Sequence, residues 1–381
     1  MRSILSRFDN GASIFTRIIT LFIVAITYKW FGFIFERLFS KRFKLCLKYS
    51  CIVFSPNQLR VAEWCETVGI ELSVISIGQF KSPYNHINHR QLMLLALCNS
   101  TVLLRHVFKS FRDGLYRDNF MRLVKLSGID LILQKVDFAQ LLFNFNDHSP
   151  ANILYYDYGK LNNKKVVYIQ HAPVSIHFPP LFHDLNVLFS QDSIDKYRNP
   201  NNRKIFELFD FHFTEMEGHK RPEENKVLIC TNPLDSLEEI KKLIVLLIHS
   251  GYSVLYRPHP RDTRELNFKY AKLRCSIDRN PQNDIASCIA MITNESAVIL
   301  DSIFQNKPTY KAAFLSKDVR DNYGFLAKGL VIREFENPES LLDSLMNLEK
   351  CYNRQKLDYF IGAIQNRNKI VNKFKRVLLG L

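Results

Sequence analysis

An arginine, a histidine and a second arginine fall within one short segment, Arg257-Pro258-His259-Pro260-Arg261. The segment follows the apolar run 252–256, which predicts a buried strand that opens into a loop. The prolines cannot continue a hydrogen-bonded ladder, so they end the strand and stiffen the loop. Ligands of open α/β sheets bind at the carboxyl ends of the strands. The segment therefore predicts a site for an anionic ligand, with a basic surface loop as the alternative.

Two further loops meet the same criterion, because polar residues follow an apolar run. One is Asn146-Asp147-His148-Ser149 and the other is Gln170-His171. The carboxylate of Asp147 can take a proton from a hydroxyl group. For each histidine the alternative is structural, since His148 can cap the helix that follows and His171 can be satisfied within its loop.

A fourth group, Asn294-Glu295-Ser296, precedes the predicted helix 297–305. Free backbone N–H groups and the positive end of the helix dipole attract phosphate at such a position. The Ser296 hydroxyl can add another donor. A simple N-cap is the alternative interpretation.

Predicted strands and helices alternate along most of the chain, which indicates parallel α/β sheets. The charge-dense stretch 214–226 predicts a boundary between two Rossmann-like domains, at 46–222 and 223–355. A basic helical tail is expected at 356–381. The last strand of the second sheet is expected at 329–332.

The candidate groups fall on both sides of this boundary. Three of them, Asp147, His148 and His171, precede the boundary. The other three, Arg257, His259 and Ser296, follow it. We expect them to face each other across a cleft, where small-molecule sites tend to lie. A carboxylate on one wall could take a proton from an acceptor hydroxyl while cations and helix N–H groups stabilise a departing phosphate. The sequence lacks a convincing Asp-x-Asp pair, so we predict neither a metal nor another cofactor.

The chain has 381 residues, with 52 Lys and Arg against 37 Asp and Glu and a net charge of +15. Such an excess favours nucleic acid, anionic lipid or phosphorylated small molecules as partners. We predict no nucleic-acid partner, because no helix-turn-helix, zinc-finger spacing or aromatic RNA-binding signature is found. The eight cysteines show no C-x-x-C spacing and are predicted to be reduced, mostly buried thiols.

The first 45 residues predict a membrane-associating helix. Residues 18–28 are apolar apart from threonines, and most cations between 29 and 44 fall on one helical arc. The helix could lie in the membrane interface with its cations on lipid phosphates. The alternatives are a tilted span over about 18–35 and a helix packed on the protein's own core.

The second half of the chain resembles the donor domain of bacterial surface-polysaccharide glycosyltransferases of the GT-B fold. The resemblance rests on Arg257-Pro258-His259-Pro260, then Asn294-Glu295-Ser296, then Gln305-Asn306-Lys307-Pro308. The nearest patterns are those of bacterial sialyltransferases and polysialyltransferases and of CDP-glycerol glycerophosphotransferases. The resemblance covers mainly 226–312, and less securely 141–180.

This resemblance implies that His259 contacts the donor phosphate and acts as a general acid toward it. Ser296 would bind the same phosphate, with Asn294 and Glu295 close to the nucleotide, and Arg257 would add supporting charge. Asp147 would take the place of the base that activates the acceptor hydroxyl.

The sequence departs from the family pattern in two places. Asn146-Asp147-His148 lacks the glycine of the acidic motif, which leaves His148 and His171 as rivals for the base. Glu295-Ser296 stands where the family has two hydroxyl residues. The second departure weakens the choice of a cytidine donor and leaves a UDP-sugar open.

Together these features predict a metal-independent glycosyltransferase at the cytoplasmic face of a bacterial inner membrane. It would move a sugar or polyol phosphate from a nucleotide-activated donor, CMP- or CDP-linked, to a surface glycan or lipid-linked acceptor. The alternatives are a nucleotide-sugar epimerase of the same architecture and a non-catalytic, membrane-bound nucleotide-sugar-binding partner in glycan assembly.

Overall fold

The computed structural model describes residues 49–78, 80–98, 120–136, 138–146, 148–197, 204–213, 222–260, 262–266, 269–278, 280–316, 321–362 and 367–381. The predicted N-terminal helix, Asp147 and Arg261 lie outside the described residues. Within these ranges no helix is both long and apolar enough to cross a membrane.

The first sheet has the strand order β3-β2-β1-β4-β5-β6-β7, and neighbouring strands from β3 to β6 pair in parallel. Its strands are β1 (Tyr49–Val53), β2 (Leu72–Ile77), β3 (Asn85–Ile87), β4 (Leu141–Asn144), β5 (Lys165–Ile169), β6 (Leu185–Leu188) and β7 (Lys204–Glu207). The helices described along this part of the chain are α3 (Pro56–Thr67), α4 (His89–Cys98), α6 (Phe120–Lys135), α7 (Pro150–Leu161) and α8 (Gln191–Tyr197).

The second sheet has the order β10-β9-β8-β11-β12-β13, and all of its neighbouring strands are parallel. Its strands are β8 (Lys226–Cys230), β9 (Ser253–Arg257), β10 (Leu273–Cys275), β11 (Ala290–Thr293), β12 (Thr309–Ala312) and β13 (Glu334–Phe335). The helices described along this part of the chain are α9 (Leu237–His249), α10 (Pro281–Ser287), α11 (Val298–Phe304), α12 (Pro338–Met346), α13 (Leu357–Ile361) and α14 (Arg367–Leu379), with short 3-10 turns at Ala313–Leu315 and Arg354–Lys356. The last residues of α14, from Lys375 on, belong to the same compact unit as the first sheet.

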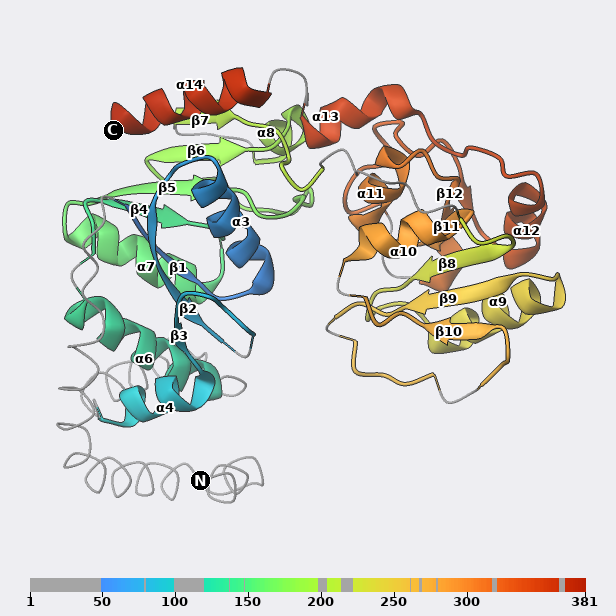
Figure 1. Cartoon of the computed structure of the whole chain (residues 1–381), viewed down its shortest axis with the longest axis horizontal. Coiled ribbons are helices and arrows are strands. Elements are labelled where there is room, and N and C mark those ends of the chain that lie inside the picture. Colours follow the sequence, from blue (N-terminus) through green and yellow to red (C-terminus); the bar gives the residue numbers. More distant parts are fainter. Residues whose placement is uncertain are drawn as a thin grey trace. The chain divides into compact units, whose positions relative to one another are not determined.

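In each sheet the strand order reverses direction at one point (Figure 1). The reversal lies between β1 and β4 in the first sheet and between β8 and β11 in the second. Both orders follow the Rossmann pattern, in which the loops at the reversal are splayed apart and leave room for a ligand. The predicted pair of parallel α/β sheets is therefore confirmed, and the polar loops can be placed relative to these two reversal points.

Local sequence explains where several helices begin. Ser55, Ser149 and Ser236 each accept a hydrogen bond from the backbone N–H three residues later, so each caps a helix. In α3 and α7 a proline follows the cap directly, where its missing N–H costs nothing. These caps place α7 directly behind the polar loop that follows β4.

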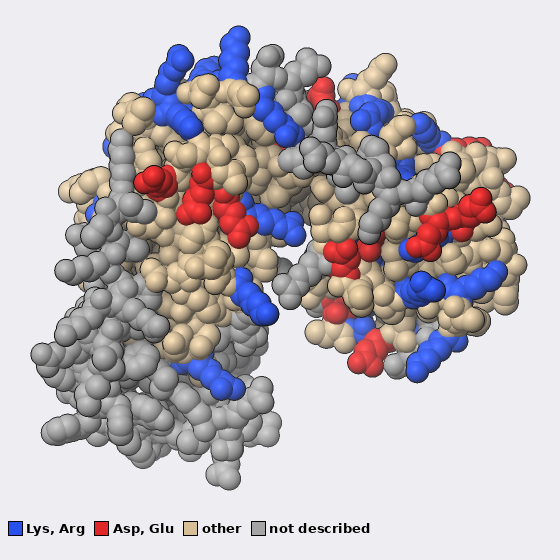
Figure 2. All heavy atoms as spheres, in the orientation of Figure 1, with Lys and Arg blue, Asp and Glu red and all other residues tan. Residues whose placement is uncertain are grey.

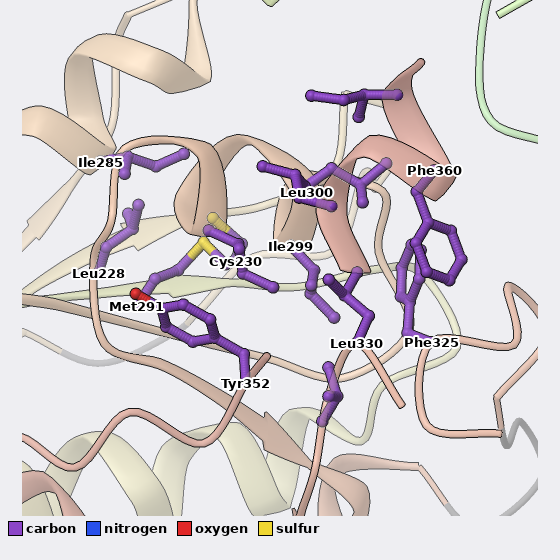
Figure 3. Packing of buried hydrophobic residues seen from close by; sticks show 14 of the residues in the cluster. Leu228, Cys230, Ile285, Met291, Ile299, Leu300, Phe325, Leu330, Tyr352 and Phe360 are labelled. Atoms are coloured by element: carbon purple, nitrogen blue, oxygen red, sulfur yellow. The ribbon is translucent and has the colours of Figure 1, made fainter. Parts of the chain in front are cut away.

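The core of the C-terminal sheet shows why this sheet is covered on both faces. Along β8, Leu228 and Cys230 belong to one buried apolar cluster, whereas Val227 and Ile229 belong to another. Figure 3 shows the first cluster, in which Leu228 and Cys230 lie among side chains from α10, α11, α13 and the chain between them. The second cluster includes the buried face of α9. Continuous apolar strands of this kind are typical of parallel sheets covered by helices on both sides.

The chain forms two compact units, and each is assembled from separate stretches of the sequence. One contains the described residues up to His171, together with Phe182–Val187 and Lys375–Leu381. The other contains Ala172–Leu181 and Leu188–Phe374. The connection between β5 and β6 thus packs with the C-terminal half of the chain. The proposed domain division at 222 and 223 stays a prediction.

The expected last strand at 329–332 is wrong. Within it only Val331 forms a bridge, isolated and with Tyr352, whereas the last strand is β13. The backbone N–H groups of Leu330 and Val331 both donate to the carbonyl of Phe325, at 2.9 and 3.0 Å. A turn therefore uses the donors that a strand at this position would need.

The described cysteines largely match the prediction of buried thiols. Cys51, Cys65, Cys230, Cys288 and Cys351 are buried without disulfides, whereas Cys275 is exposed at the end of β10. Burial raises the pKa of the Cys288 thiol to about 11, so it stays protonated near neutral pH.

Candidate functional site

Three polar loops meet at the carboxyl edge of the C-terminal sheet. They follow β8, β9 and β11, which are direct neighbours in the strand order and include the reversal point. The sequence prediction used the loops of His259 and Ser296 and missed the loop after β8. The signal was present, because Thr231-Asn232 also follows a buried apolar strand.

Asp235 joins the loops on either side of the reversal point. Its carboxylate accepts hydrogen bonds from the backbone N–H and the side-chain amide of Asn232, at 2.8 and 3.1 Å, and from Asn294 Nδ2 at 3.4 Å. Burial raises the pKa of Asp235 although these hydrogen bonds act against it. Asn294 is fully buried, and its Oδ1 has no hydrogen-bond partner among the described residues.

Arg264 fastens the loop after β9 to the loop after β8. Its guanidinium donates to the carbonyls of Asp235 and Asn232, at 2.7 and 3.1 Å, and to both carboxylate oxygens of Asp262. These hydrogen bonds hold the pKa of Asp262 below its ordinary value. Sequence reasoning did not find Arg264, because its partners become visible only once the two loops are brought together.

His259 lies in a turn of this loop. Its carbonyl accepts a hydrogen bond from the backbone N–H of Asp262 at 2.8 Å, and the residue is exposed to solvent. The contacts of Arg264 with Asp262 and with the loop after β8 therefore fix the backbone on which His259 is carried. A ligand arriving from solvent at this edge can reach the imidazole.

Arg257 is engaged by protein groups. It forms an ion pair of 2.6 Å with Asp284 and donates to Ser276 Oγ at 3.2 Å and to the carbonyl of Asp278 at 2.8 Å. Its guanidinium thus holds the chain after β10 against α10. The predicted contact of Arg257 with a donor stays a prediction.

The residues after β11 divide into an accessible one and a buried one. Ser296 is half-buried, and its Oγ accepts from the backbone N–H of Val298 at 3.4 Å, whereas the cap residue of α11 is Ala297. The Glu295 side chain is only 3% exposed and pairs with Lys311 Nζ at 3.0 Å. Burial alone would lower the pKa of Lys311, but Glu334 and Glu295 outweigh it and raise that pKa. Lys311 therefore stays charged.

In the N-terminal unit, the loops that contain His148 and His171 follow β4 and β5, which pair in parallel. The side chain of Asn146 accepts from the backbone N–H groups of His148 and Ser149, at 3.2 and 2.9 Å. Ser149 is the cap of α7, so the alternative role of His148 as helix cap is wrong. His171 is half-buried. The structure thus brings both histidines to one edge of adjacent strands.

A buried polar network lies beside this edge, and sequence reasoning missed it. The amide of Asn152 donates to Asn144 Oδ1 at 2.5 Å, and Asn144 Nδ2 lies 3.0 Å from His183 Nε2. The His183 ring stacks on Phe182 and Tyr168, with centroid distances of 4.3 and 5.2 Å. The ring of His183 is fully buried.

Comparisons with known proteins identify the fold. No family model matches the chain, and no curated protein matches it. The structure of S. aureus MnaA with UDP matches with a TM-score of 0.55 at 11% identity, over 87% of this chain and 97% of that one. The UDP-GlcNAc 2-epimerase of Methanocaldococcus jannaschii gives 0.53 at 12% identity, over 88% and 100%. A variant of the wall teichoic acid polymerase TagF soaked with CDPG gives 0.50 at 13% identity, over 87% and 88%.

The chain therefore has the GT-B fold of two Rossmann-like units. Enzymes with that fold include an epimerase and a polymerase among those compared. In the part of the chain that the structure describes, no group of three His, Cys, Asp or Glu side chains could hold a metal ion.

Proposed function

We propose that the protein transfers a sugar or a polyol phosphate from a nucleotide-activated donor, and that the donor binds at the carboxyl edge of the C-terminal sheet. The observation that carries this proposal is the position of three polar loops at the reversal point between β8 and β11. In sheets of this order the reversal point is where nucleotides bind. His259 is exposed on the adjacent loop, and Ser296 lies directly after β11.

The proposed reaction is a displacement at the donor. A hydroxyl oxygen of the acceptor forms a bond to the transferred group, and the bond from that group to the nucleotide phosphate oxygen breaks. The hydroxyl proton passes to Asp147, with His148 and His171 as the alternative bases. Negative charge develops on the departing phosphate, where His259 donates a proton and the Ser296 hydroxyl donates a hydrogen bond.

A nucleotide-sugar epimerase is the second candidate, because the M. jannaschii structure that shares the fold is one. An epimerase changes the donor without any acceptor. A non-catalytic nucleotide-sugar-binding partner would bind the donor and leave it unchanged. The transferase is preferred because of the Arg-Pro-His-Pro and Asn-Glu-Ser motifs and their resemblance to transferase donor domains.

A nucleotide screen tests the proposal. CMP, CDP, UDP and GDP are added separately to the full chain, and the unfolding temperature is recorded. A ligand that binds only the folded state at about 100 times its Kd stabilises it by roughly 2.7 kcal/mol. We expect CMP, CDP or UDP to raise the unfolding temperature. If none of the four does so, the proposed donor site is wrong.

The same screen supplies the donor for a product assay. A transferase gives a new glycan product only with acceptor present, whereas an epimerase gives a changed donor without it. Recovery of the unchanged donor under both conditions would favour the non-catalytic partner.

We further propose that the protein works on an anionic membrane surface, at the cytoplasmic face of a bacterial inner membrane, through the cationic side of α14. Lys369, Lys373 and Arg376 are exposed on this helix, whereas Phe374 and Leu378 are buried. The helix contains no acidic residue. Figure 2 shows Lys and Arg side chains along the upper edge of the face, where α14 lies in Figure 1. Such a face suits lipid phosphates, and the predicted helix 1–45 would add a second contact.

Exchanging Lys369, Lys373 and Arg376 together for glutamine is expected to weaken vesicle binding, because each surface cation contributes about 1 kcal/mol. The measurement is cosedimentation with phosphatidylcholine vesicles, with and without phosphatidylglycerol. We expect a loss of at least about tenfold, only for the anionic vesicles. The control exchanges three exposed lysines elsewhere, Lys242, Lys269 and Lys272. Equal losses in both triple variants would show that total charge, and not α14, governs binding.

A further inference from the structure

One loop contact links the residues after β11 to a segment from the first half of the chain. The Glu295 carboxylate accepts hydrogen bonds from the backbone N–H groups of Asp321 and Asn322, at 2.6 and 3.0 Å. Asp321 has a positive φ of 50°, and its own carboxylate accepts from the backbone N–H groups of Leu326 and Ala327. The loop 321–323 is therefore held by its hydrogen bonds to Glu295 and by those that the Asp321 carboxylate accepts from Leu326 and Ala327.

The other side of the same loop holds two elements of the first half. The carbonyl of Asn322 accepts from the backbone N–H of Ile176 at 3.1 Å, and the carbonyl of Tyr323 accepts from Lys196 Nζ at 2.7 Å. Lys196 belongs to α8 and pairs with the buried Asp192 at 2.5 Å. The backbone of Asn322 thus forms two hydrogen bonds. Its N–H donates to Glu295, and its C=O accepts from the N–H of Ile176.

Glu295 shares a buried cation with a second carboxylate. The fully buried Lys311 lies 3.0 Å from Glu295 and 2.8 Å from Glu334, so two carboxylates share one ammonium. Two backbone N–H groups of loop 321–323 also donate to the Glu295 carboxylate. The contacts of the Glu295 carboxylate go to Lys311 and to the backbone N–H groups of Asp321 and Asn322.

We infer that Glu295 is a positioning residue, which holds the segment 172–178 by way of loop 321–323. That segment directly follows His171, and Glu295 directly precedes Ser296. Glu295 and the segment 172–178 are thereby linked through two hydrogen bonds at one backbone residue, Asn322. The effect on turnover rests on the proposed function, whereas the effect on loop order does not.

Hydrogen exchange tests the loop order. In Glu295→Gln the carboxamide can accept from one N–H group only, and its NH₂ faces the other. We expect faster amide exchange both in peptides covering 321–323, to which the Glu295 side chain is hydrogen-bonded, and in peptides covering 172–178. The matched control is Glu334→Gln, which removes the negative charge of the other partner of Lys311 and is not part of this link. Faster exchange at 172–178 in the control as well, or unchanged exchange there in Glu295→Gln, would overturn the inference.

Nucleotide affinity and turnover form the second arm. A direct charge-assisted hydrogen bond to the nucleotide would be worth about tenfold or more in Kd. We expect Glu295→Gln to change the nucleotide Kd by less than this and to lower turnover, because misplacement by about 1 Å can cost roughly 100-fold. A tenfold loss of affinity with full turnover would mean that Glu295 touches the ligand. If the wild-type chain binds no nucleotide, the proposed function fails while the exchange result still decides the inference.

A second variant interrupts the link at its other end and keeps Glu295 intact. Ile176→Pro removes the N–H that Asn322 accepts, at a residue whose side chain is exposed. Loop 321–323 should stay protected, while 172–178 exchanges faster and turnover falls. Normal turnover despite faster exchange at 172–178 would refute the role of the link in activity. This variant also decides the question if Glu295→Gln does not fold.

Discussion

Replacement of His259 by alanine is expected to lower the rate of transfer by about 100- to 10,000-fold, the range that a positioned general acid contributes. The imidazole is exposed at the proposed donor edge, and the turn closed by Asp262 fixes its backbone. Because few protein contacts depend on an exposed side chain, the unfolding temperature should change little. The measurement is the single-turnover rate with the donor identified by the nucleotide screen.

A matched control is His249→Ala, which removes an exposed histidine from the last turn of α9. Its transfer rate should equal that of the wild-type chain. A near-normal rate for His259→Ala would exclude His259 as the general acid. If His259→Ala loses both its transfer activity and its cooperative unfolding transition, His259 is needed to maintain the structure of the loop.

The largest stability effect is expected for Gly362→Ala. Gly362 has φ of 76°, and an added Cβ would lie 2.3 Å from the carbonyl oxygen of Phe189 and 2.9 Å from Cα of Phe209. These are backbone atoms, which cannot rotate away. With ψ of 156°, Gly362 lies in a region that only glycine commonly adopts, which costs another residue about 1–3 kcal/mol, and overpacking adds roughly 1–3 kcal/mol.

The control for this variant is Gly329→Ala. Gly329 has nearly the same φ, 72°, but nothing lies within 4 Å of its added Cβ. Its cost should be the conformational part alone, about 1–2 kcal/mol. Calorimetric unfolding of both variants gives the difference. Equal destabilisation would mean that the backbone around Phe189 and Phe209 shifts easily, and that the crowding at Gly362 contributes nothing.

Local pattern predicted the buried strands well because their signal is local. The apolar runs at 165–169, 226–230 and 290–293 coincide with β5, β8 and β11. The short edge strands β3, β7 and β10 were not predicted. Each of these strands has only three or four residues, and some of these residues are exposed, as in β10. The sequence pattern of such a strand is therefore weak. These segments become strands because they pair with a neighbouring strand. The sequence alone does not identify that neighbour.

The candidate site divides in the same way. The loops of His148, His171 and His259 were predicted because each follows an apolar run in the sequence. The structure places each loop at the carboxyl end of a strand. Side-chain direction was not predictable. The side chains of Arg257 and Glu295 contact Asp284 and Lys311 respectively, which the motifs did not indicate, and their predicted roles toward a donor stay predictions. Charged groups bury only with partners, and these partners lie too far along the chain for a motif to reveal them.

The discontinuous make-up of the two units has a consequence for synthesis on the ribosome. The segment Ala172–Leu181 emerges early, between the parallel strands β5 and β6, yet it belongs to the unit that is otherwise Leu188–Phe374. Its hydrogen-bond partner Asn322 is translated much later. Until Asn322 is synthesised, the connection between β5 and β6 lacks this contact. We expect a chain released before Asn322 to leave this connection open to proteases, which would mark unfinished chains for removal.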